Sequence, residues 1–416
     1  MIDKLLNPTI LFSSLVGIIV PAMIIVRNCT TALLFTFVVL GVKNIDFKKL
    51  KSYILSDRFV QVFICFLLYG VISAYWSEFT LLSFKKALLL LSLGIAGVVF
   101  YFLYSNVQPK LKFMFIAIST GILIITPLII YDVTHQFVLV NMIRDYQINV
   151  PSYYNRISVI LSFLIWPMIW RLFKGTAIEK VFLTIAITLS FLTIFTLQNA
   201  ASKVVLISGI IIFASSYIMP RILPWLICGV TVFYMLVAPF VHKNIDPMQV
   251  VNITVSKKMI SFHHRLLIWE FVSQRIFEKP ILGHGFDAMR KEHKFGNLKR
   301  EWETYINKQV DPYPSLGISQ KLHDLNMPYH AHNLSLQVWY ELGIIGVILA
   351  AALLIIAAKN ISLMQLKSKD AGMVNACFAG IILIMHSSFD IWQTWWVSIC
   401  IIIITLLKHI LQTRDT

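Results

Sequence analysis

A series of long apolar runs constrains this chain more than any other feature. A helix needs about 20 apolar residues to cross a lipid bilayer, within a range of roughly 17–25. The run at 29–42 is short, and a re-entrant hairpin with the run before it is an alternative there. The sequence therefore predicts an all-α polytopic membrane protein with about twelve transmembrane helices. The runs cover residues 9–26, 29–42, 59–76, 86–105, 111–131, 157–172, 179–197, 204–219, 222–241, 334–357, 372–388 and 393–408.

Composition agrees with a bilayer location. The chain is 58% hydrophobic and 13% charged, whereas soluble domains are roughly 45–50% apolar and about 25% charged. The net charge of +16 raises nucleic-acid binding as an alternative, but no basic run is long enough to form a nucleic-acid arm. Lysine-rich cytoplasmic loops explain the charge better, so no nucleic-acid partner is expected. The five cysteines form no CxxC pair, which argues against a disulfide framework or a zinc site.

Basic residues predict the orientation. Lysine and arginine cluster in the linkers 43–58, 105–112, 171–180 and 358–371 and in the tail. With about twelve spans, these segments and both termini fall on one side of the membrane, which the positive-inside rule assigns to the cytoplasm. The first apolar run is long enough to remain as a span rather than act as a signal peptide.

The longest outward linker, 242–333, is expected to fold as a cap. Linkers longer than about 12–15 residues are usually functional or disordered, and this one carries the apolar stripe of an amphipathic helix. Pro280 ends that helix, Gly283 and Gly285 form a turn, and a second helix is expected at 299–309. The stripe consists of Phe262, Leu266, Trp269, Val272 and Ile276.

This linker divides the chain into three parts. Residues 1–241 carry the first nine transmembrane helices, residues 242–333 form the periplasmic loop domain, and residues 334–416 carry the last three helices and the cytoplasmic tail.

The outward linker is also rich in histidine. A solvated surface explains most of these side chains, and no HExxH pattern or acid–histidine spacing indicates a metal site. His332 differs because it lies where the linker meets the tenth span, at the membrane–water boundary. The linker and its edge hold eight of the eleven histidines, namely His242, His263, His264, His284, His293, His323, His330 and His332.

Polar residues follow His332 into the tenth span. Asn333 is placed to cap the helix, and Asn333, Gln337 and Glu341 recur at i, i+4 and i+8, so that one helix face is polar for two turns. An ionisable residue inside a membrane is costly and indicates function, although a stripe used only for helix packing is an alternative. Gly343 and Gly346 are expected to serve close helix packing.

Four outward cations provide charge for an anionic ligand. Arg265 lies on the amphipathic helix, Arg144 and Arg156 lie on another outward linker, and Lys203 begins the eighth span. Ordinary solvated side chains are the alternative for each. Fixed cations are what a pyrophosphate leaving group requires.

These residues resemble a known family. His332-Asn333, nine further residues, then Gly343 and Gly346 read as H-N-x(9)-G-x-x-G, which resembles the signature of the O-antigen ligase family. Arg265 followed by Trp269, and the P-I-L-G-H-G turn at 280–285, match the loop pattern of the wider superfamily of ligases, polymerases and protein O-glycosyltransferases. The resemblance is close over roughly residues 200–350. One departure is Ser202-Lys203, where the family usually carries an arginine; lysine keeps the charge but loses the bidentate geometry.

The resemblance implies a GT-C-like glycosyltransferase of the Gram-negative inner membrane, with its site facing the periplasm. Its donor is O-antigen on undecaprenyl pyrophosphate, its acceptor is a lipid A–core sugar hydroxyl, and it needs no metal or cofactor. Histidine, with an ordinary pKa of about 6.5, suits a general base, and a single displacement inverts the anomeric carbon. The implied roles are general base for His332, diphosphate binding for Arg265, Lys203, Arg156 and Arg144, and support for Asn333, Gln337, Glu341 and Trp269.

Three rival functions share some of these features. An O-antigen polymerase performs the same class of reaction on a lipid-linked acceptor, and a protein O-glycosyltransferase is typically longer. A secondary transporter has a similar span count, but it typically shows inverted repeats and broken helices near the middle of the membrane, and the sequence shows no such pairing.

Overall fold

The computed structural model describes residues 7–25, 29–105, 107, 110–143, 151–253, 260–310, 327 and 329–412. Within these residues all regular structure is helical. The helices are α2 (Pro8–Ile25), α3 (Cys29–Gly41), η1 (Val42–Asn44), α4 (Phe47–Ser56), α5 (Arg58–Ser73), η2 (Ala74–Trp76), α6 (Thr80–Ser105), α7 (Leu111–Thr134), α8 (Val138–Ile143), η3 (Pro151–Tyr154), α9 (Asn155–Leu172), α10 (Ala177–Thr196), α11 (Ala200–Ser215), α12 (Leu223–Asn244), α13 (Pro247–Ile253), α14 (Ile260–Ile276), α15 (Ala288–Phe295), α16 (Leu298–Val310), α18 (Leu334–Leu363), α19 (Ser368–Ser387) and α20 (Thr394–Leu411).

Every apolar run of the sequence falls on a helix. Among the described residues, eight helices are long and apolar enough to cross a membrane, which confirms a polytopic membrane protein. The count of about twelve spans stays a prediction. Two of the other runs, α2 and α11, form shorter apolar helices, and α3 with η1 meets α4 at a bend of 118°. The last, α9, is buried along almost its whole length. The eight helices are α5 with η2, α6, α7, α10, α12, α18, α19 and α20.

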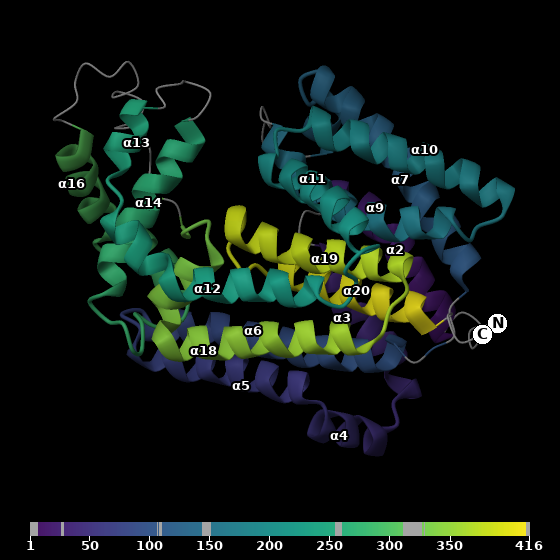
Figure 1. Ribbon diagram of the computed structural model, residues 1–416, viewed down its shortest axis with the longest axis horizontal. Helices are drawn as coiled ribbons and strands as arrows, with labels where there is room; N and C mark the ends of the chain where they lie inside the picture. Colours follow the sequence, from purple (N-terminus) through teal and green to yellow (C-terminus); the bar gives the residue numbers. More distant parts are fainter. Residues whose placement is uncertain are drawn as a thin grey trace.

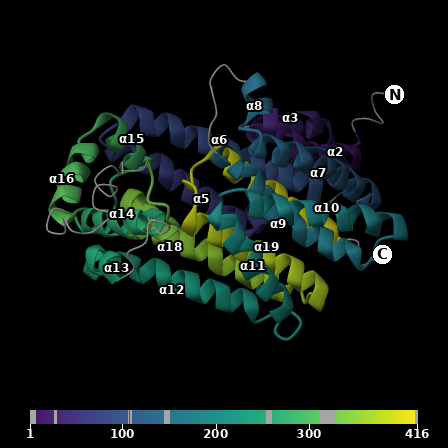
Figure 2. The same cartoon turned by 90° about the horizontal axis from the view of Figure 1, so that it is seen from above.

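The long helices run side by side and place the linker helices at one end. Figure 1 shows α13, α14 and α16 at the end of the molecule opposite the point where α20 finishes, and Figure 2 shows the same separation from above. Among the main helix pairs, α11 packs against α19, α2 against α7 and α12 against α18. The linker domain is held to the bundle because α14 packs against both α12 and α18.

The sequence patterns of the linker correspond to real helices. The apolar stripe lies on α14, and the second predicted linker helix corresponds to α16. Leu266, Val272 and Ile276 are buried, while Phe262 is 41% exposed. The stripe therefore predicts the helix correctly but overstates how many of its apolar side chains are buried.

Helix α18 is broken at Gly343, whose φ of 62° and ψ of −163° are not helical. The break leaves the carbonyls of Tyr340 and Glu341 without their usual helical donors. The turn at 280–285 supplies them: the His284 N–H donates to Tyr340 at 2.8 Å and the Gly285 N–H donates to Glu341 at 2.9 Å. Gly343 does permit the close approach expected of it, since an added Cβ would lie 2.2 Å from the Ile281 carbonyl oxygen. The partner is the 280–285 turn, and the positive φ of Gly343 also makes the break possible.

Candidate functional site

His332 occupies the last loop position but one before α18 and has a left-handed backbone, with φ of 52°. Its Nδ1 lies 2.6 Å from the Ser388 carbonyl oxygen. A carbonyl can only accept a hydrogen bond, so Nδ1 carries the proton and Nε2 keeps its lone pair. This contact therefore fixes the tautomer that a general base requires.

His330 shares the same carbonyl. Its Nε2 lies 3.3 Å from the Ser388 oxygen, and its ring centroid is 4.1 Å from that of His332. The same reasoning leaves a lone pair on Nδ1 of His330, and this atom is buried without a hydrogen-bond partner among the described residues. The sequence gives no role to His330 beyond that of a surface histidine, and the H-x-H spacing is the local signal for this histidine pair.

The surroundings of His332 disfavour its protonated form. Burial lowers the pKa of its imidazole from 6.5 to about 3, and nearby His330, Arg265 and His264 also lower it, against the opposing Ser388 hydrogen bond. The ordinary value near 6.5 expected from the sequence is therefore wrong for this buried imidazole. The imidazole is neutral at physiological pH but is a weak base until another charge enters.

Asn333 fixes the start of α18 directly after His332. Its Oδ1 accepts the N–H groups of Ser335 and Leu336 at 3.0 and 3.4 Å, which is the predicted helix cap. Its Nδ2 donates to the Tyr234 hydroxyl of α12 at 2.7 Å. The cap is therefore anchored to a neighbouring helix.

Trp269 fixes the other side of His332. Its indole Nε1 donates to the Ala331 carbonyl at 2.9 Å, and its ring lies 4.9 Å from the His242 ring. His242 in turn contacts the Tyr234 hydroxyl at 2.9 Å. The backbone on both sides of His332 is thus held by one connected set of buried contacts.

Gln337 and Glu341 point to the α19–α20 loop that carries Ser388. Gln337 Nε2 donates to Asp390 at 2.8 Å, and the Trp392 indole donates to Glu341. Both side chains are 1–2% exposed. The polar face predicted on α18 is therefore an internal contact surface that holds the loop carrying the Ser388 carbonyl.

Two buried acidic residues, Asp287 and Asp390, complete the contact between α18 and the α19–α20 loop, and the sequence does not predict them. Asp390 pairs with Arg290, and Asp287 lies 3.4 Å from both Arg290 and Lys291. Burial and the nearby Asp390 raise the pKa of Asp287 to about 6. Asp287 also donates its backbone N–H to Glu341 at 3.1 Å. The pairing joins residues 100 positions apart, so no local pattern indicated it.

Arg265 is the predicted cation that the structure brings to His332. It lies on α14, half-buried, and its charge is among those that lower the pKa of His332. Within the described residues it forms no ion pair, whereas Arg275 pairs with Glu292 and Glu301. Among the described residues, no acidic side chain therefore neutralises its charge.

Arg156 reaches the same region from the opposite side. Its guanidinium carbon lies 4.9 Å from the centroid of the Trp395 ring. Trp395 meets Phe389 edge to face at 4.9 Å, and Phe389 follows Ser388. In Figure 1, α14 and α9 lie on two sides of α19, whose end leads into this loop.

Lys203 lies on α11, which packs against α9, the helix that carries Arg156. Its Nζ is 5.9 Å from the centroid of Phe195. The starts of α9 and α11 are joined because Asn199 Nδ2 donates to the Asn155 carbonyl at 3.1 Å. Lys203 thus accompanies Arg156 rather than Arg265, and Arg144 lies outside the described residues.

The arrangement combines a neutral imidazole with the guanidinium of Arg265. Such a pair can take a proton from a hydroxyl while stabilising negative charge on a leaving group. In the described part of the chain no three His, Cys, Asp or Glu side chains come together to hold a metal ion.

A family model described as O-Antigen ligase matches residues 184–351. The family model matches the part of the chain that carries Arg265, Trp269 and His332–Glu341, but not the α19–α20 loop or Arg156. A Rickettsia typhi protein is 31% identical over 258 residues, covering 62% of this chain and 58% of that relative. A Rickettsia prowazekii protein is 31% identical over 262 residues, with the same coverage. A Rickettsia conorii protein is 35% identical over 181 residues, covering 42% of this chain and 38% of the relative.

Each of these three relatives is named "Putative polysaccharide ligase". The matches span less than two thirds of each relative's length. No solved structure matches the chain.

Proposed function

Since the chain belongs to the O-antigen ligase family, we propose that it transfers O-antigen polysaccharide from undecaprenyl pyrophosphate to a sugar hydroxyl of lipid A–core. The transfer takes place at the periplasmic face of a Gram-negative inner membrane. The observation that carries this proposal is the fixed tautomer of His332, whose Nδ1 is held by the Ser388 carbonyl at 2.6 Å. Both substrates are lipids, which suits a base at the junction of a loop and a membrane helix.

The reaction is a single displacement. The acceptor oxygen forms a bond to the anomeric carbon while Nε2 of His332 takes its proton, and the bond from that carbon to the diphosphate breaks. Undecaprenyl diphosphate leaves with the electron pair, and the anomeric centre inverts. His330 offers a second hydrogen-bond acceptor, Nδ1, to a neighbouring hydroxyl of the substrate. This hydrogen bond gives a partner to a buried atom that has none among the described residues.

Arg265 links donor binding to the strength of the base. Its positive charge lowers the pKa of His332. A bound diphosphate offsets that charge and adds negative charge of its own, so donor binding raises the basicity of His332. Arg156 and Lys203 supply further positive charge from the side of α9 and α11.

Arg265→Ala is expected to reduce transfer by roughly 100-fold, because it removes a cation that stabilises the leaving group. Arg265→Lys keeps the charge without the bidentate geometry and is expected to lose about tenfold. In vitro transfer from a lipid-linked donor measures both, with the exposed Arg300→Ala as control. Full activity of Arg265→Lys would rule out bidentate recognition at this position.

The pH dependence of transfer provides a separate test. The pKa of His332 is lowered, so its neutral form persists as pH falls and is lost only near pH 3. The acid limb of kcat/KM for the donor is therefore expected well below pH 6.5, and the acid limb of kcat at a higher pH than that of kcat/KM. Rates measured from pH 5 to 8 in proteoliposomes check this; a kcat/KM limb at 6.5 would contradict the buried base.

Deletion of the gene for this protein in its own host tests the proposed function directly. A ligase deletion removes all polymer from lipid A–core and leaves polymer on the carrier lipid, which lipopolysaccharide gels and carrier-lipid extraction detect. Retention of a single repeat on the core indicates the polymerase instead. A transporter would show no transfer activity as a purified protein, with or without a substitution at His332.

A further inference from the structure

Helix α4 is a short helix set across the bundle. It meets α3 and η1 at 118°. Asp46 caps its start by accepting the N–H groups of Lys48 and Lys49 at 3.0 and 3.1 Å. Asp57, just after its end, accepts the Val60 N–H at 3.1 Å and so caps α5. Capping side chains therefore mark both ends of α4, which is a defined helix and not an irregular linker.

One side of α4 packs on the bundle. Leu50 is 8% exposed, and the Tyr53 ring lies 5.8 Å from the Phe102 ring of α6. This packing fixes which face turns outward.

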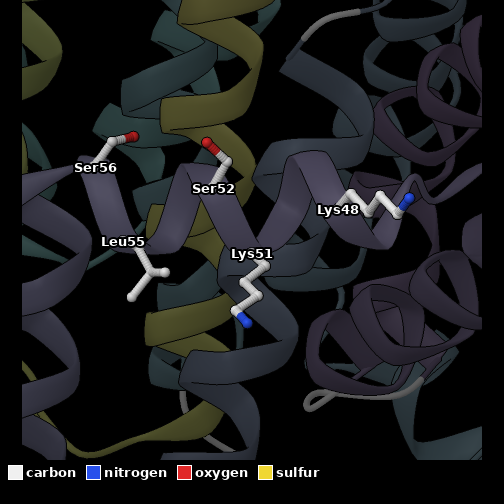
Figure 3. Close-up of a pocket in the computed structure, with 5 residues that line it drawn as sticks. All are labelled: Lys48, Lys51, Ser52, Leu55 and Ser56. Carbon is white, nitrogen blue, oxygen red and sulfur yellow. The ribbon is translucent and has the colours of Figure 1, made fainter.

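The outward face borders a shallow, open hollow lined by polar and apolar side chains of α4 alone. Figure 3 shows Lys48, Lys51, Ser52, Leu55 and Ser56 along this face of α4, which crosses the helices behind it. Their spacing of 3, 1, 3 and 1 places them on one side of a helix. The hollow that they line has a volume of about 450 Å³.

The two lysines of this hollow carry charge that the described residues do not neutralise. Neither Lys48 nor Lys51 forms an ion pair, whereas Lys49, on another face, lies 3.7 Å from Asp46. Phe47 and Leu55 beside them are 68% and 65% exposed. Exposed apolar side chains flanked by free lysines are typical of a helix that lies in the membrane interface.

The position of α4 favours a lipid over a soluble anion. It leads directly into α5, which with η2 is long and apolar enough to cross a membrane. The far end of that span, Trp76, donates its indole N–H to the Leu282 carbonyl at 3.3 Å, beside the turn that packs on α18. The hollow therefore lies at the membrane surface opposite the His332 site.

We infer that α4 binds the headgroup of an anionic phospholipid, with Lys48 and Lys51 on the phosphate and Leu55 and Phe47 against the start of the acyl chains. Lysines near a membrane surface attract anionic lipids, and the Ser52 hydroxyl adds a hydrogen-bond donor, whereas the Ser56 hydroxyl donates to the Tyr53 carbonyl at 3.3 Å. This site is separate from the transfer reaction and does not depend on it.

The test uses the full-length protein in detergent, titrated with fluorescent phosphatidylglycerol. Lys48→Ser combined with Lys51→Ser is expected to weaken binding roughly 30-fold, since each lysine contributes about fivefold. Lys49→Ser is the matched control, because it removes one lysine of the same helix that is already paired, and is expected to change binding less than about twofold. Helical circular dichroism verifies that each variant is folded.

Competitors identify the ligand. Phosphatidylcholine and inorganic phosphate at equal concentration are expected not to displace the probe, and Lys48→Arg with Lys51→Arg is expected to retain binding. Equal losses in Lys49→Ser and the double variant, or displacement by inorganic phosphate, would overturn the inference. Unchanged binding in the double variant would do the same.

Discussion

Replacing His332 with alanine is expected to lower transfer by at least about 100-fold, since a positioned general base typically contributes 10²–10⁴-fold. His332→Gln is expected to lose as much, although its amide can still donate to the Ser388 carbonyl, because it has no titratable lone pair. The measurement is the amount of polymer on lipid A–core in cells, together with initial rates of the purified protein.

His135→Ala is the matched control for these variants. His135 directly follows α7, and its ring contacts the Tyr131 carbonyl at 2.9 Å. It is expected to keep full activity, with equal protein in the membrane for all variants. Polymer ligated at normal levels by His332→Ala would remove His332 from the chemistry and with it the proposed mechanism.

Replacing Gly343 with alanine is expected to prevent normal folding. Its φ of 62° disfavours any other residue, and an added Cβ would lie 2.2 Å from the Ile281 carbonyl oxygen. Backbone strain and overpacking together cost on the order of 3–5 kcal/mol. Fluorescence-detected size exclusion and thermal melting of the detergent-solubilised protein measure this loss.

Gly229→Ala in α12 provides the comparison, because an added Cβ there meets nothing within 4 Å. Alanine is the better helix former by roughly 1 kcal/mol, so this variant is expected to be as stable as the parent or slightly more stable. A Gly343→Ala protein that melts like Gly229→Ala would show that the break in α18 is not required.

Local periodicity explains what could be predicted from the sequence. Apolar runs give the membrane helices, and the stripe at 262–276 gives α14, because both patterns depend only on neighbours within a few residues. Asn333 was likewise identified as a cap from its position alone, and its contacts with Ser335 and Leu336 bear this out.

Contacts between distant residues explain what could not be predicted. Ser388 acts through its backbone carbonyl, which leaves no trace in residue type, and it meets His332 across 56 positions. Burial by the folded chain sets the pKa of His332, so the ordinary value of a free histidine was a poor guide. The sequence motif identified Gly343 but not its backbone conformation, since close packing and positive φ both select glycine.

The break in α18 has a consequence for exchanging parts between relatives. The segment 280–285 provides hydrogen bonds that a continuous α18 would make within itself, and Pro280 returns one by accepting the Ile344 N–H at 2.9 Å. A chimera that takes the linker 242–333 from one relative and the last three helices from another divides the partners of these hydrogen bonds between two parents. We expect such chimeras to fold best when the crossover points keep the turn and the interrupted helix from a single parent.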